Sequence, residues 1–272
     1  LRRAGLFSLL FLLAACFALP VRAAEAGTVI GTVSNTATGN LAYSVEDALV
    51  PGRALYLQLV RTYNSLDFDE GPLGHGWSFN YGMRISSGPT ENSVIIRWGD
   101  GSKRLFLANA DGSYRSPYAT FSALVKNADE THTLTHKRGT RYNFDASGRL
   151  TSITDKNANV VTLAYSGEDL LSITDPSGRT LAFEHDTQGR IARMSAPHGA
   201  TVYTYDSRGD LIRVSAPGYE ANYAYDGNHA LLSYQDPRAQ TGYPKGSFSY
   251  NEFRQVTAEF DGTARMVAAL AY

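Results

Sequence analysis

Through the second half of the chain, short apolar segments alternate with polar turns at a nearly constant spacing of about twenty residues. Most units begin with a ring-bearing residue and Asp, continue through a Gly-containing turn, and end in a segment rich in Leu, Ile or Val. The ring positions of successive units are Phe144, Tyr165, His185, Tyr205 and Tyr225. A fixed period of this kind indicates stacked units, none of which buries its apolar face alone.

One unit shows which local structure the pattern predicts. Tyr203 and Tyr205 lie two residues apart, so both rings project from one face of a strand, because side chains alternate along it. Asp206 and Gly209 predict a turn, since Asp accepts backbone hydrogen bonds and Gly adopts a positive φ. Residues 211–214 predict the second strand. Further turns are predicted at residues 175–178, 216–218 and 236–237. The unit is therefore a β-hairpin, and the array is an antiparallel meander.

The first half is also predicted to be β-rich. Strands are expected at residues 55–63, 94–98 and 103–107, and Asp100-Gly101 between the last two is a strong hairpin signal. No Ser/Pro-rich or charged linker separates the halves, so we expect one continuous sheet system. The domain prediction is a β-rich N-terminal domain over residues 28–118 and a repeat array over residues 119–272.

The repeated Tyr-Asp-x-x-Gly-Arg-Leu pattern resembles the YD repeats of Rhs proteins. The front half resembles the N-terminal domain of unknown function that precedes those repeats, in four stretches: residues 38–40, 51–53, 61–65 and 71–81. The resemblance covers roughly residues 28 to 260 and includes about six repeats. It implies an all-β chain whose repeats, in long family members, wrap into a hollow shell around a C-terminal toxin.

The N-terminus has the pattern of a secretory signal peptide over residues 1–24. Arg2 and Arg3 precede an apolar run at residues 6–19, and cleavage is expected after Ala23 or Ala24. Residues 13–16 also fit a lipobox that would acylate Cys16, although the apolar run continues beyond it. The chain is thus predicted to be exported, to the periplasm, the cell surface or the medium, with a lipoprotein anchored at Cys16 as the alternative.

Charge and cysteine content narrow the function classes further. The formal net charge is −1, and removing Arg2, Arg3 and Arg22 lowers Lys+Arg from 25 to 22 against 26 Asp+Glu, which leaves −4. The basic residues are scattered, so we expect no nucleic-acid partner, which would need a clustered basic surface. Cys16 is the sole cysteine, so disulfides cannot stabilise the mature chain.

The histidines do not form a predicted metal site. His132 and His136 are four apart, but their context is that of a strand, where four residues span ~13 Å and cannot converge on one ion. We expect them to lie on a solvated strand face. His185 replaces the aromatic ring of the motif, and His229 stands where other units have Gly, a position His tolerates. His75 lies in a glycine-rich turn for which we expect a conformational role.

The acidic residues also have structural explanations. Asp67, Asp69 and Glu70 match a calcium loop only in part, because Gly71 comes one residue early, so a solvated turn is expected. The periodic acids before turns are expected to be backbone acceptors: Asp145, Asp186, Asp206 and Asp226. Residues 175–178, Asp-Pro-Ser-Gly, resemble the self-cleavage boundary of long Rhs shells but are expected to form an ordinary inter-hairpin turn. No catalytic, cofactor-binding or metal-binding residue is predicted, and no enzyme activity.

Two functions remain open. The first is a structural scaffold of Rhs type, a fragment of a β-shell that encloses or presents a partner or toxin chain. The second is a cell-surface module that recognises carbohydrate or protein through exposed aromatic strand faces. Rings that point inward favour the shell, and a solvent-facing aromatic ladder favours adhesion. Residues 266–272 are apolar and uncapped, so the last strands are expected to pair with another copy or with a separate, downstream chain.

Overall fold

The computed structural model describes residues 28–52, 54–117, 121–235 and 245–272. The predicted signal peptide, Cys16 and the turn predicted at residues 236–237 lie outside these ranges. Within them the chain forms strands and turns, and none of these described segments is a helix long and apolar enough to cross a membrane.

Four strands near the N-terminus form one sheet, which we call the inner sheet. Its order is β1-β2-β3-β6, with β1 at Thr28–Ser34, β2 at Leu41–Val50, β3 at Leu57–Asn64 and β6 at Trp77–Phe79. Its neighbouring strands pair antiparallel. A separate two-stranded hairpin, β4 (Glu70–Gly71) and β5 (Gly74–His75), leaves the inner sheet between β3 and β6.

The remaining strands form one long antiparallel sheet in chain order. Its first part is β7 (Arg84–Ser87), β8 (Ser93–Arg97), β9 (Lys103–Ala108), β10 (Ser113–Arg115), β11 (Ser122–Lys126), β12 (His132–His136) and β13 (Arg141–Phe144). Its middle part is β14 (Leu150–Thr154), β15 (Val160–Ser166), β16 (Asp169–Thr174), β17 (Thr180–His185), β18 (Ile191–Ala196) and β19 (Gly199–Tyr205). Its last part is β20 (Leu211–Ala216), β21 (Tyr219–Tyr225), β22 (Leu231–Gln235), β23 (Lys245–Tyr250), β24 (Val256–Phe260) and β25 (Met266–Ala269). Each strand pairs with the next, from β7 to β25.

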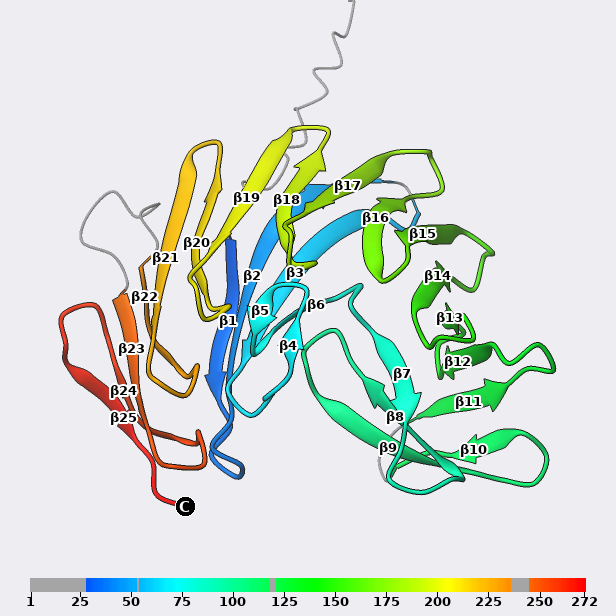
Figure 1. Cartoon of the computed structure of the whole chain (residues 1–272), viewed down its shortest axis with the longest axis horizontal. Coiled ribbons are helices and arrows are strands. Elements are labelled where there is room, and N and C mark those ends of the chain that lie inside the picture. The colour runs from blue at the N-terminus through cyan, green and yellow to red at the C-terminus, as the bar shows by residue number, and fades with distance from the viewer. Residues whose placement is uncertain (1–27, 53, 118–120, 236–244) are drawn as a thin grey trace, which may run out of the picture.

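The long sheet curves strongly, and the inner sheet lies within the curve (Figure 1). A register shift occurs in the repeat hairpins just before the motif ring, for example between Thr204 and Tyr205 and between Ala224 and Tyr225. The same shift precedes Phe144, Tyr165, His185 and Tyr250. Because a β-bulge bends a strand and increases its twist, a bulge in each repeat gives the sheet a regular source of curvature.

The core lies between the concave face of the long sheet and the inner sheet. Side chains on the repeat strands alternate, so that Tyr219, Ala221 and Tyr223 of β21 are buried while Asn222 and Ala224 are exposed. These buried residues meet Tyr43 and Trp77 of the inner sheet, whose rings lie 6.3 and 5.3 Å from the ring of Tyr223. The predicted all-β hairpin array, with rings on one strand face, is therefore confirmed.

The predicted first-half strands are confirmed at β3, β8 and β9, including the Asp100-Gly101 turn. The expectation of one continuous sheet system is wrong, because the inner sheet and the β4–β5 hairpin are separate from the long sheet. The long sheet begins at β7, so residues 28–118 of the predicted N-terminal domain supply its strands β7 to β10. Strands β7 to β10 are joined by the same kind of short turn as the repeats but lack the Tyr-Asp motif, so the sequence pattern did not reveal their membership.

Candidate functional site

The repeat acids act as caps for the turns that they precede. In the first repeat, Oδ1 of Asp145 accepts hydrogen bonds from the backbone N–H groups of Ser147 and Arg149, at 3.0 and 2.9 Å. Its Oδ2 accepts from the Nε of Arg149 at 2.8 Å. The same backbone caps recur at Asp175, Asp186, Asp206 and Asp226. Their predicted role as backbone acceptors is confirmed, and the 175–178 segment is an ordinary turn between β16 and β17.

The Arg and Tyr residues of the motif join one repeat to the next. The Arg149 guanidinium lies 5.0 Å from the ring centre of Tyr165, and that of Arg190 lies 4.4 Å from the ring of Tyr205. Each motif tyrosine also donates its hydroxyl to a carbonyl of the preceding repeat: Tyr165 to Leu150, Tyr205 to Ile191, Tyr225 to Leu211 and Tyr250 to Leu231. The Tyr, Asp, Gly, Arg and Leu positions therefore form one structural unit.

The turn acids lead to a pH prediction. Burial opposes ionisation of Asp175, but hydrogen bonds from the Arg179 backbone and guanidinium and from the Ser177 N–H outweigh it, so its pKa is lowered. The ionised Asp175 therefore stabilises the fold at pH values above its unfolded pKa of about 4, and this contribution is lost as the pH falls through the lower folded pKa. Asp175→Asn should lower the free energy of unfolding by about 1–3 kcal/mol at neutral pH. This difference from the parent chain should shrink as the pH drops.

Urea unfolding of Asp175→Asn and the parent chain, at several pH values between roughly 2 and 7, measures this difference. Glu184→Gln is the matched control, because the Glu184 side chain is 70% exposed and caps no turn. A difference that stays constant over this pH range would contradict the assignment.

A buried polar cluster joins the inner sheet to the repeats. The Nε of Arg61 on β3 lies 2.8 Å from Oδ2 of Asp47 on β2, and both side chains are fully buried. Arg61 Nη2 donates to the hydroxyl of Tyr223 at 2.7 Å, and the hydroxyl of Tyr203 donates to Asp47 at 2.8 Å. The charge pair of the inner sheet is thus hydrogen-bonded to two tyrosines of the long sheet. The repeat pattern does not predict this cluster, although charged residues within the apolar strands β2 and β3 are a usable signal.

The β4–β5 hairpin fixes the inner sheet against the repeat turns. The Pro72 carbonyl accepts a hydrogen bond from the N–H of Ile191 at 2.7 Å. His75 stacks on His229, with ring centres 3.8 Å apart, and Nδ1 of His229 lies 2.8 Å from buried Asp210. His229 has a φ of 64°, which confirms that it occupies a glycine-like position. His75 thus packs on His229 in a repeat turn, which is consistent with the conformational role predicted for His75.

The acidic cluster at residues 67–70 differs from the prediction. Asp67 is 2% exposed, and its Oδ2 accepts from the Nε of Arg97 at 3.1 Å. Lys103 Nζ lies 3.5 Å from Asp67 and 2.7 Å from Asp69. The expectation of a solvated turn is therefore wrong for Asp67, because strands β8 and β9 bring two cations against it. Sequence spacing could not show this contact.

The predicted strand is confirmed, since His132 and His136 are the first and last residues of β12. The expected solvated face is wrong for His132, whose side chain is buried. Within the described part of the chain, no group of three or more His, Cys, Asp or Glu side chains is arranged to hold a metal ion. His185 lines a small hollow of about 240 Å³ beside the β4–β5 hairpin, together with Arg149 and Glu168.

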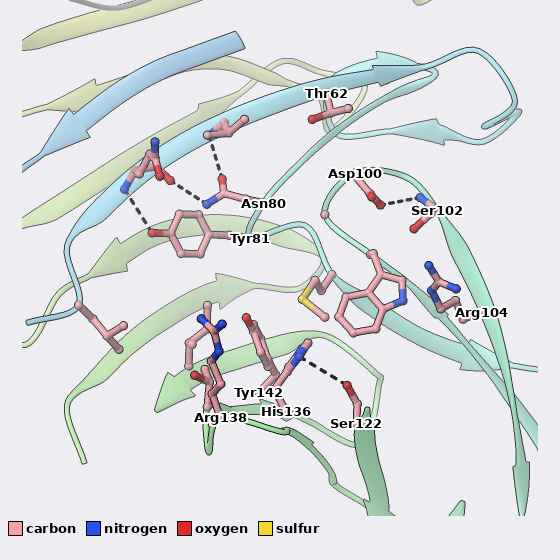
Figure 2. Close-up of a pocket in the computed structure, with 18 of the residues that line it drawn as sticks. Thr62, Asn80, Tyr81, Asp100, Ser102, Arg104, Ser122, His136, Arg138 and Tyr142 are labelled. Atoms are coloured by element: carbon pink, nitrogen blue, oxygen red, sulfur yellow. Dashed lines mark hydrogen bonds between the residues drawn. The ribbon is translucent and has the colours of Figure 1, made fainter. Parts of the chain in front are cut away.

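A larger cavity, which we call the inner cavity, lies between the inner sheet and the first strands of the long sheet. Its volume is about 1310 Å³. Asn80 and Tyr81 lie on one side of it, and His136, Arg138 and Tyr142 lie on the opposite side (Figure 2). Other lining residues include Tyr56, Gln58, Thr62, Trp98, Asp100, Arg104, Phe121, Ser122 and Lys137. The inner sheet thus covers only part of the concave face, and the cavity occupies the space beside it.

Burial lowers the pKa of His136, which favours the neutral imidazole in this wall. Its Nδ1 lies 3.5 Å from the Ser122 hydroxyl, as the dashed line in Figure 2 shows. The cavity wall therefore combines this weak hydroxyl–imidazole contact with the cations that line the cavity. The surface of the cavity is more apolar than polar, and its rim carries the cations Arg104, Lys137 and Arg138.

Two family models match the chain. One, described as "Domain of unknown function (DUF6531)", matches residues 34–106, and the other, described as "RHS Repeat", matches residues 165–201. The first covers strands β2, β3 and β6 of the inner sheet, the β4–β5 hairpin, strands β7 and β8 and most of β9. The second covers one motif repeat and part of the next.

Curated relatives include "tRNA nuclease WapA" of Bacillus subtilis strain 168 and "tRNA3(Ser)-specific nuclease WapA" of Bacillus spizizenii. Each is 30% identical over 138 residues, which are 51% of this chain and 6% of the relative. The chain therefore corresponds to a small portion of these proteins.

Among solved structures, the chain is similar to the Photorhabdus luminescens Tc holotoxin pore, at 13% identity and a TM-score of 0.34, over 84% of this chain and 14% of that chain. It is also similar to TcdB2-TccC3 without its hypervariable C-terminal region, at 12% identity and a TM-score of 0.37, over 79% of this chain and 16% of that chain. The models of a DUF6531 domain and of an RHS repeat thus match successive parts of the chain, which confirms the resemblance to Rhs proteins that its Tyr-Asp motifs indicate.

Proposed function

We propose that this chain is a non-catalytic part of an Rhs-type shell, in which the curved repeat array encloses a polypeptide. The observation that carries the proposal is that the long sheet already surrounds a segment of its own chain, the inner sheet. Arg61 and Asp47 of that segment meet Tyr203 and Tyr223 of the repeats in a fully buried cluster. The concave face is thus suited to hold protein, and the inner cavity leaves room beside the inner sheet.

The direction of the tyrosine rings favours this function over a surface binding module. Tyr203, Tyr219, Tyr223 and Tyr234 are each at most 8% exposed, and they point toward the inner sheet. The outer face instead carries single exposed apolar residues such as Leu171, Val202 and Leu232. An adhesive aromatic ladder for carbohydrate or protein would need the rings on that outer face.

The names of the curated relatives describe tRNA nucleases, and this chain matches only 6% of their length. We place any such toxin activity outside the region described here, because the repeat carboxylates are used in turn caps. In this proposal the region supplies enclosure, and a toxin segment of the same or a partner protein is what it encloses.

The partner is proposed to be another segment, of the same or of a partner protein, that pairs with β25, the last strand of the described sheet. Met266 and Val267 on this strand are 55% and 58% exposed. An apolar edge strand presents unpaired backbone groups that accept a further strand. The preceding turn at residues 261–265 is capped by Asp261 like the repeat turns, so the hairpin register continues to this edge.

The test is size-exclusion chromatography with light scattering on the exported chain, alone and mixed with the product of the adjacent downstream reading frame. The mass of the exported chain also checks cleavage after Ala23 or Ala24, against a lipidated Cys16. We expect a stable complex in which the partner resists added protease. Val267→Lys on the edge should weaken the complex.

Val202→Lys is the matched control, because Val202 is 37% exposed on the central strand β19 and offers no free edge. This variant should associate as well as the parent chain. A folded monomer that ignores the downstream product, or a complex that Val267→Lys leaves intact, would contradict the proposal.

A further inference from the structure

The inner cavity has a size that suits a polymer segment better than a small molecule. Its volume of about 1310 Å³ exceeds the ~300–1,000 Å³ typical of small-molecule sites. It is bounded by β3 on one side and by strands β12 to β14 on the other, with the β8–β9 turn between them. A ligand here would therefore contact both the inner sheet and the long sheet.

The charges around the cavity are mostly positive. Arg104, Lys137 and Arg138 line it and are exposed, and no ion pair joins any of them to a carboxylate of the described residues. Asp100 is the single acidic residue among the described lining residues, and its Oδ1 caps the N–H of Ser102 at 2.9 Å. The surplus of unpaired cations favours an anionic ligand.

Apolar rings lie beside these cations. Phe121 is 71% exposed and Tyr56 is 46% exposed, although both line the cavity. Lys137 Nζ lies 4.9 Å from the ring centre of Phe121. Exposed rings next to cations suit a chain that alternates apolar and acidic side chains, since each kind finds its complement.

Two buried nitrogens in the cavity wall lack partners. Trp98 Nε1 and His136 Nε2 have no hydrogen-bond partner among the described residues, and their rings meet edge to face at 5.5 Å. A buried polar group without a partner is costly, so a bound acceptor that reached either nitrogen would remove this cost. A carboxylate is such an acceptor, and it also complements the cations.

We propose that the inner cavity binds an extended acidic segment of a polypeptide, in contact with Arg104, Lys137 and Arg138. This inference rests on the proposed enclosing function and specifies the chemistry of the enclosed chain. Acidic side chains meet the cations, and apolar side chains between them meet Phe121 and Tyr56.

The probe is a fluorescein-labelled synthetic peptide of glutamate, leucine and serine, roughly 12 residues long, which spans at most ~40 Å when extended. Fluorescence anisotropy with the full mature chain measures its affinity. We expect it to bind about tenfold tighter than the same peptide with glutamine in place of glutamate, and to weaken with added salt. Any change in tryptophan fluorescence on peptide binding should come from Trp98, because the other tryptophan, Trp77, is buried in the core. Trp98→Phe should therefore remove that change.

The charge-reversed variant Lys137→Glu/Arg138→Glu should lose at least about tenfold in affinity. Its matched control is Arg193→Glu/Arg213→Glu, which makes the same charge change at exposed positions away from the cavity and should bind normally. Equal binding of the glutamine peptide, or full binding by the cavity variant, would overturn the proposal. Tighter binding of an anionic oligosaccharide, oligogalacturonate, would overturn it in favour of a saccharide ligand.

These outcomes are separate from those of the association test. If the downstream product associates and the acidic peptide does not bind, the cavity inference fails while the enclosing function stands. If the peptide binds in a charge-dependent way and the downstream product does not associate, the cavity inference is supported while the choice of partner fails.

Discussion

Replacing Arg61 with alanine is expected to lower the free energy of unfolding by about 3–5 kcal/mol, the range found when one partner of a buried ion pair is removed. The Asp47 carboxylate would keep its fully buried position but lose the guanidinium that lies 2.8 Å away. The Tyr223 hydroxyl would also lose its contact with Arg61. Because these groups join the inner sheet to the repeats, the loss should be cooperative over the whole chain.

Urea unfolding followed by tryptophan fluorescence measures this effect, since the Trp77 ring lies 4.8 Å from the Arg61 guanidinium. The control is Arg213→Ala, whose partner Glu220 forms a surface ion pair on exposed side chains. That variant should change stability by no more than about 1 kcal/mol. A similarly small effect of Arg61→Ala would contradict the role assigned to the cluster.

Two further variants keep the prediction testable if Arg61→Ala does not fold. Tyr223→Phe removes one hydroxyl contact and should cost about 1–3 kcal/mol. Asp47→Leu/Arg61→Met removes both charges together and should be far less damaging than Arg61→Ala alone, because no buried charge is left unpaired. If the double variant were as unstable as the single one, packing and not charge would explain the loss.

The repeat array could be predicted because its information is local. A Tyr-Asp-x-x-Gly-Arg-Leu unit specifies its own turn, since Asp186 caps backbone groups only two and four residues away. The strand alternation is local as well: it predicted that Tyr203 and Tyr205 lie on one face of their strand, but it left open whether that face points inward, and the structure buries Tyr203. Even His229, which breaks the motif, was correctly interpreted from its position in the turn.

The sequence could not show how the array and the inner sheet fit together. The hydrogen bond from Tyr203 to Asp47 spans 156 positions, and no period or spacing connects them. Asp67 was expected in a solvated turn because its partners, Arg97 and Lys103, belong to strands about thirty residues later. The inner cavity depends on the same long-range packing, so its cations appeared only as scattered charges. Local pattern therefore predicted the repeats, and tertiary contacts determined the site.

Replacing Gly148 with alanine should be the second most damaging change. Gly148 has a φ of 79°, and a Cβ atom there would lie 1.9 Å from the carbonyl oxygen of Ile85. The Ile85 N–H donates to the Gly148 carbonyl at 2.8 Å, so β7 cannot move away without losing this bond. Alanine at this left-handed φ adds backbone strain of about 1–2 kcal/mol, and the clash adds a steric cost of about 1–3 kcal/mol. The free energy of unfolding should therefore fall by about 2–5 kcal/mol.

Gly178→Ala isolates the steric part of this effect. Gly178 has a φ of 80° in the same kind of Asp-capped turn, but nothing lies within 4 Å of the position its Cβ would take. It should therefore cost only the backbone strain, about 1–2 kcal/mol. Urea unfolding gives both values, and hydrogen exchange at the Ile85 amide shows whether β7 detaches. Equal losses of unfolding free energy in the two variants would mean that β7 does not pack on the 145–149 turn. A larger loss and faster Ile85 exchange in Gly148→Ala alone would show that this contact holds the first strand of the long sheet against its repeats.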